Sequence, residues 1–229
     1  MKFEKFNVRS LQVKMPVTLY QYNVSPVSRA VLMVVELIGL KTENIAVSTL
    51  TGEQFHPEYV AKNPVHTVPI IEDGDFILAD SHAIITYLVS KYGGDKRATL
   101  YPSDLKIRAT VEQRLYFDAT FLFPRFKDAV VPIVREKAKT VPAEAASKIE
   151  EAYGFLETYL TKSKYLAADH LTIADASVSY VSSLDLLVPI DGDKYPKLKA
   201  WFENLQEQEW YKKGNAPGLA ALDAIIKGT

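Results

Sequence analysis

The hydrophobic pattern of this chain changes character once, and this change constrains the fold more than any other feature. Up to residue 92, short β-rich runs alternate with segments whose apolar residues recur at helical spacing. From residue 104 onward the apolar repeats have helical spacing, and none alternates as a strand does. Residues 93–103 lack periodicity and contain two glycines and a proline. The pattern predicts a small α/β domain followed by an all-helical domain.

The α/β part is expected to fold as strand, helix, strand, short helix, hairpin and helix. Its β-rich runs lie at residues 16–20, 43–47, 67–71 and 76–78. An Asp-Gly pair separates the last two runs, which is the usual signal of a tight hairpin. Helical patterns lie at residues 25–39 and 80–92, and the segment 52–62 has room for a helical turn or two. The sequence thus predicts a thioredoxin-like domain of order β-α-β-α-β-β-α.

The helical part is expected to contain helices near residues 105–137, 142–162, 172–188 and 194–208, and one after residue 217. We assign residues 15–93 to the thioredoxin-like domain, 94–103 to a linker and 104–229 to the helical domain. Residues 1–14 are an N-terminal extension that mixes basic and apolar side chains. It is either a weak amphipathic import signal or a tail, and Glu4 favours a tail.

Composition excludes several functional classes. The 229 residues have a formal net charge of -1, which lacks the basic excess of a nucleic-acid binder. There is no cysteine, so disulfides, thiolate metal sites and a cysteine nucleophile are impossible, and four scattered histidines do not predict a metal site. No apolar run is long enough for a membrane helix, and the N-terminus lacks the apolar core of a secretion signal. We therefore expect a cytoplasmic protein without nucleic-acid or membrane partners.

Three places in the α/β part have residues suited to a short zwitterionic ligand. A hydroxyl at Ser25, before a helix, either caps that helix or hydrogen-bonds a ligand thiolate. Asp80 and Ser81 at a later helix are either a plain capping pair or a site for an ammonium and a carboxylate. The proline of Val68-Pro69 is either an ordinary trans residue or a cis residue that leaves the Val68 backbone free for a peptide ligand.

Five motifs occur in the order and at the spacing of one known family. They are SPVSRA at 25–30, GEQ at 52–54, NPVHTVP at 63–69, DSHAI at 80–84 and LTIAD at 171–175. On these motifs, residues 15 to about 225 resemble the cytosolic glutathione transferases, most closely the insect delta and epsilon classes. The resemblance implies the two-domain fold, transfer of glutathione as co-substrate to small hydrophobic electrophiles, and a homodimer.

By the same resemblance, Ser25 activates the glutathione thiol, so the protein needs no cysteine nucleophile. The implied glutathione contacts are Gln54, His66, Thr67, Val68, cis Pro69, Asp80, Ser81 and His82. Gln54 stands where the delta class often has histidine, and His82 stands where arginine is common. A tyrosine-type enzyme would use Tyr20 or Tyr22 near the first strand, and the placement of Ser25 before a helix fits better.

The resemblance places the acceptor-substrate pocket beside the helical segment that begins at residue 104. The candidate lining residues are Tyr116, Phe117, Phe121, Phe123, Arg125 and Phe126, although aromatic residues at helical spacing also fill cores. Helical spacing puts Phe117 with Phe121 on one flank and Phe123 with Phe126 on another. Pro124 predicts a kink in this segment. Because Arg125 is the only cation in the aromatic stretch, we expect neutral, flat electrophiles to be preferred.

Two other functions fit the same fold. One is a non-catalytic carrier of hydrophobic ligands or hormones, and the other is a transferase-like module of a larger assembly, as in translation factors. The chain ends about where a free-standing transferase would, which disfavours the module. A carrier has no need for thiol activation, so Ser25 favours the enzyme. The sequence therefore predicts a glutathione transferase.

Overall fold

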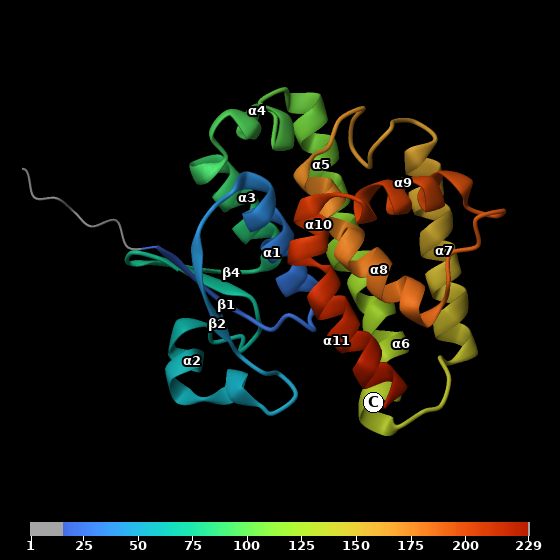
Figure 1. Cartoon of the computed structure of the whole chain (residues 1–229), viewed down its shortest axis with the longest axis horizontal. Coiled ribbons are helices and arrows are strands. Elements are labelled where there is room, and N and C mark those ends of the chain that lie inside the picture. The colour runs from blue at the N-terminus through green and yellow to red at the C-terminus, as the bar shows by residue number, and fades with distance from the viewer. Residues whose placement is uncertain (1–15, 229) are drawn as a thin grey trace, which may run out of the picture.

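The computed structural model describes residues 16–228 of the chain. The predicted extension at residues 1–14 lies outside them. A sheet with its helices forms one side of the molecule, and a larger group of helices forms the other (Figure 1). Among the described residues, none of the helices is long and apolar enough to cross a membrane.

The α/β domain is a four-stranded mixed sheet of order β2-β1-β3-β4. Its strands are β1 (Val17–Gln21), β2 (Thr42–Ala46), β3 (Ile70–Asp73) and β4 (Phe76–Ala79), and its helical elements are α1 (Pro26–Ile38), η1 (Glu53–Phe55), α2 (Pro57–Lys62) and α3 (Ser81–Tyr92). β1 pairs parallel with β2 across the α1 connection and antiparallel with β3. The predicted fold class and element order are confirmed.

Two turns in this domain follow directly from glycine. Gly39 ends α1 in the left-handed conformation, with φ 71°, and its N–H bonds back to the last helical turn. Gly74 turns β3 into β4 with φ 69°. One face of the sheet packs on α1 and α3, while Val47, Tyr59 and Val68 form a small separate core under α2 on the other face.

The helical domain contains α5 (Leu105–Phe117), α6 (Phe123–Glu136), α7 (Ala143–Leu160), α8 (Val178–Leu187), α9 (Pro196–Gln206), α10 (Glu209–Gly214) and α11 (Ala216–Lys227). The segment 94–103, expected as an irregular linker, holds the turn η2 (Gly94–Lys96) and the helix α4 (Arg97–Leu100). A helix of four residues is too short to produce a periodic signal, so the sequence pattern gave no sign of it.

The break in the long aromatic segment lies just before Pro124. A π-helical turn, η3 (Asp118–Leu122), joins α5 to α6. Pro124 then occupies the first turn of α6, where its missing N–H costs no helical hydrogen bond. The irregular part of the segment is therefore the wide turn that ends just before the proline.

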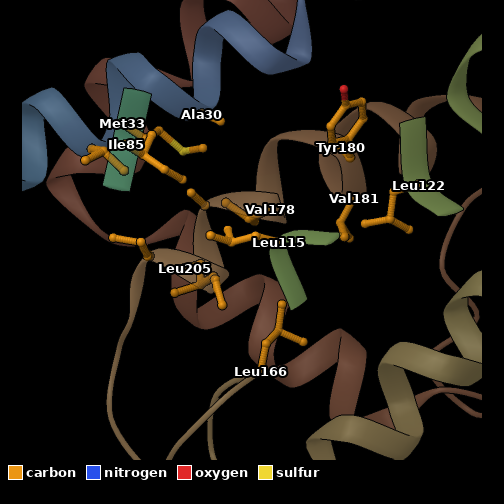
Figure 2. Packing of buried hydrophobic residues seen from close by; sticks show 14 of the residues in the cluster. Ala30, Met33, Ile85, Leu115, Leu122, Leu166, Val178, Tyr180, Val181 and Leu205 are labelled. Atoms are coloured by element: carbon orange, nitrogen blue, oxygen red, sulfur yellow. The ribbon is translucent and has the colours of Figure 1, made fainter. Parts of the chain in front are cut away.

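The two domains share one hydrophobic core. Ala30 and Met33 of α1 and Ile85 of α3 meet residues of the helical domain such as Leu115 and Val178 (Figure 2). α10 lies directly against α1, because a Cβ at Gly214 would come within 2.6 Å of the backbone of Met33. This packing holds the middle of α1 against the helical domain.

The turn η4 (Ile173–Ser177) precedes α8 and contains a capping box in LTIAD. The carboxylate of Asp175 is fully buried and accepts hydrogen bonds from the backbone of Leu166 and Thr172 and from Trp201 Nε1. These bonds connect the start of α8 to α9 and stabilise the packing of the helical domain.

Candidate active site

A cavity of about 360 Å³ lies between the two domains at the N-terminus of α1. The α/β domain contributes Ser25, His66, Thr67 and the Val68 backbone region to its lining. The helical domain contributes a mainly apolar wall from α6, α8 and α11. A cavity with polar groups on one side and apolar groups on the other suits a polar ligand that reacts with an apolar partner.

Ser25 is the N-cap residue of α1, but its side chain makes no capping hydrogen bond. Its backbone N–H donates to the Tyr22 carbonyl at 2.8 Å, and its carbonyl accepts from the Arg29 N–H at 3.1 Å. The hydroxyl is therefore held at the positive end of a helix, on the cavity wall, without a capping role. Of the two alternatives for Ser25, the capping role is not realised in this structure, and the ligand-binding role stays a prediction.

The loop before Ser25 is held from inside by Arg29, which is fully buried. Its guanidinium donates to the Val24 carbonyl at 3.1 Å and, across the domain boundary, to the Ser179 carbonyl at 3.2 Å and to Ser183 Oγ. Burial lowers the pKa of Arg29 to about 10, so it keeps its charge at neutral pH. Sequence reasoning did not single out Arg29, although it lies one turn after Ser25 in SPVSRA.

The Val68–Pro69 peptide bond is cis, as the resemblance implied. Two buried side chains hold the preceding residue: Tyr59 Oη donates to the Thr67 carbonyl at 2.7 Å, and Asn63 Nδ2 donates to it at 2.9 Å. They fix the position of the Thr67-Val68 backbone on the cavity wall. Neither residue was singled out from the sequence, although Asn63 begins the motif NPVHTVP.

His66 and Gln54 lie on the same side of the domain. His66 has φ 48° and its ring lies 4.9 Å from the ring of Phe55. It is exposed at the cavity. Gln54 is buried outside the lining of this cavity, and its Oε1 has no hydrogen-bond partner among the residues of the structure.

Asp80 and Ser81 start α3. Asp80 has φ 75°, and its Oδ1 accepts from the backbone N–H groups of His82 at 2.9 Å and Ala83 at 3.1 Å. Ser81 is buried, with 4% of its surface exposed. The capping role of Asp80 is thus real, while its side chain remains 67% exposed and accessible to a cation.

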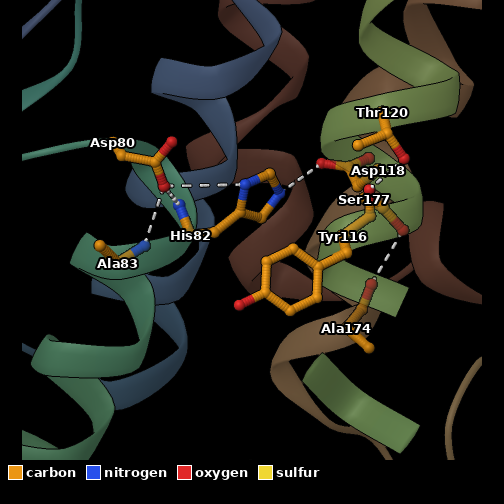
Figure 3. A network of polar contacts seen from close by, with 8 residues as sticks. All are labelled: Asp80, His82, Ala83, Tyr116, Asp118, Thr120, Ala174 and Ser177. Atoms are coloured by element: carbon orange, nitrogen blue, oxygen red, sulfur yellow. Dashed lines mark hydrogen bonds and ion pairs between the residues drawn. The ribbon is translucent and has the colours of Figure 1, made fainter. Parts of the chain in front are cut away.

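His82 turns toward Asp118 of the helical domain (Figure 3), and it is not among the residues that line the cavity beside Ser25. Its Nε2 lies 2.7 Å from Oδ2 of buried Asp118, and its Nδ1 lies 3.8 Å from Oδ1 of Asp80. Burial by itself would lower the pKa of His82, but the hydrogen bond and charge of Asp118, with the charge of Asp80, raise it. Asp118 was not singled out from the sequence.

Ser25 and the start of α3 border two different cavities. Ser25, His66, Thr67 and Val68 line the first, whereas Asp80 and His82 line a neighbouring groove of about 610 Å³ between α3 and α5.

The six candidates for the acceptor pocket divide into two groups. Phe123 and Phe126 line the cavity and contact the ring of Tyr180, with centroid distances of 6.1 and 6.0 Å. Phe117 and Phe121 stack on each other at 5.1 Å on the far flank, against α7. The prediction that the two pairs lie on different flanks is confirmed.

The structure places the other four candidates, Phe117, Phe121, Tyr116 and Arg125, outside the lining of this cavity. Tyr116 lines the groove between α3 and α5. Arg125 donates to the Lys148 carbonyl and forms an ion pair with Glu151 on α7. Helical spacing accounts for the division of the phenylalanines, because it puts Phe117 and Phe121 on a different flank from Phe123 and Phe126.

The comparisons with known proteins agree with this geometry. The chain matches the model of the glutathione S-transferase N-terminal domain over residues 19–96 and that of the C-terminal domain over residues 114–209. It is 44% identical over 207 residues to glutathione S-transferase 1 of Manduca sexta, covering 89% of this chain and 94% of the relative.

Two solved structures extend the comparison. An epsilon-class glutathione S-transferase from the housefly, Musca domestica, has a TM-score of 0.88 and 42% identity, with coverage of 93% of this chain and 97% of that chain. A glutathione transferase homologue from Drosophila mojavensis with bound glutathione has a TM-score of 0.86 and 40% identity, with coverage of 93% and 97%.

The chain therefore belongs to the glutathione S-transferase family. Its relatives include insect delta-class and epsilon-class glutathione transferases, as the five motifs predicted. The predictions of family, fold class and transferase activity are confirmed.

Proposed function

We propose that Ser25 is the catalytic residue of this glutathione transferase and that its acceptors are small hydrophobic electrophiles. The observation that carries the proposal is the Ser25 hydroxyl, which lies on the cavity wall at a helix N-terminus and does not cap the helix. A hydroxyl placed there donates to the glutathione sulfur and stabilises the thiolate, with support from the partial positive charge of α1.

The reaction then needs no nucleophile from the protein. The thiolate attacks the electrophilic carbon, a carbon–sulfur bond forms, and the leaving group departs with the bonding electron pair. Phe123, Phe126 and Tyr180 offer an apolar surface for the acceptor opposite Ser25. Arg29, through Val24, is a positioning residue that keeps Ser25 on the wall.

The remaining contacts are proposed by assigning residues of this chain to the cysteinyl, glycyl and γ-glutamyl parts of glutathione. The Val68 backbone pairs with the cysteinyl unit, and His66, Thr67 and Gln54 lie toward the glycyl carboxylate, with Pro69 shaping the loop. At the other end, Asp80 pairs with the ammonium group, and Ser81 takes the γ-glutamyl carboxylate through its hydroxyl and its own backbone N–H. His82 positions the start of α3 through Asp118.

We also propose a homodimer and a cytoplasmic location. Support for the dimer comes from apolar side chains on the surface, such as Phe76 at 42% and Ile77 at 40% exposed on β4. Light scattering should give twice the monomer mass at micromolar protein, and a monomer mass would contradict the proposal. Cell fractionation tests the location.

The carrier alternative is tested by binding and turnover together. Retention on immobilised glutathione with turnover of a chlorodinitrobenzene is the outcome expected for an enzyme. Retention without turnover would identify a carrier. A protein that is neither retained nor active would contradict the proposed glutathione site.

A further inference from the structure

Two cations, Lys127 and Arg135, line the helical wall of the cavity beside Ser25. We propose that they select acceptors with a flat apolar body and an anionic group, such as aromatic carboxylates or sulfonates. This inference rests on the proposed function, because it names the substrate class of the same site. It replaces the expectation of neutral acceptors, which considered only Arg125.

The geometry of α6 places these cations among the apolar side chains of the wall. Phe123, Lys127, Val131 and Arg135 follow one another at intervals of four residues, so they lie along one ridge of the helix. All four line the cavity, together with Phe126, Val130 and Val134 on the adjacent ridge. An acceptor that packs against the valines therefore contacts the same face of α6 that carries both cations.

The lining of the cavity carries positive charge, and no acidic residue of the described lining neutralises it. It includes Lys127 and Arg135 but neither aspartate nor glutamate among the residues that the structure describes. Neither Lys127 nor Arg135 forms an ion pair with any residue of the described part of the chain. Lys127 Nζ lies 5.5 Å from the centroid of the Phe123 ring, which keeps the amine over the apolar wall.

The acidic residues near Lys127 lie on its other side. Asp128, Glu136 and Glu144 border a separate groove between α6 and α7, which Lys127 also touches. Arg135 lines the cavity beside Ser25 and is not among the residues that border this groove between α6 and α7. Arg135 is therefore the stronger of the two determinants, since its fork of donors also matches a carboxylate.

The cations and the proposed glutathione contacts come from different domains. Ser25, His66 and Val68 belong to the α/β domain, whereas Lys127 and Arg135 belong to α6 in the helical domain. An anion held by α6 would thus belong to the acceptor. Both cations are exposed, so the gain in selectivity is modest, about 3- to 10-fold in kcat/KM.

A matched pair of acceptors tests the proposal: a chlorodinitrobenzene and its carboxylate analogue, a chlorodinitrobenzoate. In both, the thiolate sulfur bonds to the ring carbon and chloride leaves with the electron pair of the broken bond. Each kcat/KM is divided by the uncatalysed rate with glutathione, which removes differences in intrinsic reactivity. The proteins are the wild type, Arg135→Gln, the double variant Lys127→Gln/Arg135→Gln, and Lys106→Gln as a control for an exposed lysine outside the cavity lining.

We expect the wild type to favour the benzoate and the double variant to lose about 3- to 10-fold of that preference. The neutral acceptor and the KM for glutathione should stay unchanged, and Lys106→Gln should match the wild type. Equal preference in wild type and double variant would overturn the proposal. A raised KM for glutathione with both acceptors would also overturn it, because the cations would then hold the glycyl carboxylate.

Binding separates this inference from the proposed function. The unreactive dinitrobenzoate should bind the wild type about 3- to 10-fold more tightly than it binds the double variant, as measured by calorimetry at low salt. If the wild type turns over neither acceptor yet shows this difference, the proposed function fails and the anion site stands. If binding does not differ while turnover is normal, the inference fails alone.

Discussion

The imidazole Nε2 of His82 lies 2.7 Å from Oδ2 of Asp118, and this contact joins the first turn of α3 to the π-helical turn before α6. Asp118 is buried, with 3% of its surface exposed. The pair therefore links the helix proposed to hold the γ-glutamyl end of glutathione with the segment that leads into α6, the helix proposed to form the acceptor wall.

The stability of this link depends on pH. The pKa of His82 is raised above its usual value of about 6.5, so the folded chain holds this proton more tightly than the unfolded chain. Its contribution to stability is complete below about pH 6.5 and is lost as the pH rises through the folded-state pKa. We predict that, as the pH rises above about 6.5, the free energy of unfolding falls more steeply in the wild type than in His82→Asn.

Denaturant titrations at several pH values measure this slope. His56→Asn is the matched control, because His56 forms no ion pair among residues 16–228, and it should keep the slope of the wild type. Equal slopes for wild type and His82→Asn would contradict the prediction.

Asp80 is predicted to have two separable roles. Asn at this position tolerates positive φ and caps a helix, so Asp80→Asn should keep stability but weaken glutathione binding by about 1–3 kcal/mol. Asp80→Ala should weaken binding similarly and also lower the free energy of unfolding by about 1 kcal/mol. Calorimetry and denaturation distinguish the two effects, and an unchanged dissociation constant for Asp80→Asn would refute the ammonium contact.

Two phenylalanines on the aromatic segment provide a comparison within one chain. Phe123 lines the cavity, whereas Phe121 stacks on Phe117 on the opposite flank. Phe123→Ala should change the ratio of kcat/KM between large and small acceptors without changing the KM for glutathione. Phe121→Ala should leave that ratio unchanged. The reverse result would mean that acceptors bind on the α7 side.

Gly218 in α11 allows a close approach to the loop before Ser25. A Cβ there would lie 2.0 Å from the Asn23 carbonyl oxygen and 2.8 Å from Arg29 Cδ. Gly218→Ala should lower the free energy of unfolding by about 1–3 kcal/mol and reduce kcat, because the loop must move. Gly154→Ala in α7 is the control: its Cβ meets nothing within 4 Å, so the helix should gain up to about 1 kcal/mol. Loss of stability in both variants, or in neither, would contradict this steric account.

The sequence predicted those parts of the fold that depend on local pattern. The stripe of α1 ending at Gly39, the Asp73-Gly74 hairpin and the Thr172-Asp175 capping box each follow from neighbouring residues. Short α4 left no periodic signal, and α10 directly follows α9, so neither appeared as a separate helix.

The site was predictable to the extent that it lies in continuous motifs. Ser25 and the cis peptide at Val68 belong to such motifs. The proposed acceptor wall was predicted only in part. Helical spacing separates the flank of Phe117 and Phe121 from that of Phe123 and Phe126, but it does not show which flank faces the cavity. Lys127 and Arg135 were missed although they follow Phe123 at the spacing of one ridge.

The most direct test of the central claim is the pKa of the glutathione thiol bound to wild type and to Ser25→Ala, followed by the ultraviolet absorbance of the thiolate against pH. In the wild type, the bound thiol should ionise below the value of about 8.5 typical of a free thiol. Ser25→Ala should raise that pKa and reduce kcat/KM by ~10²–10³, while Tyr22→Phe, another hydroxyl residue in the cavity lining, should have little effect. An unchanged pKa in Ser25→Ala, with activity lost instead in Tyr22→Phe, would contradict the assignment of Ser25.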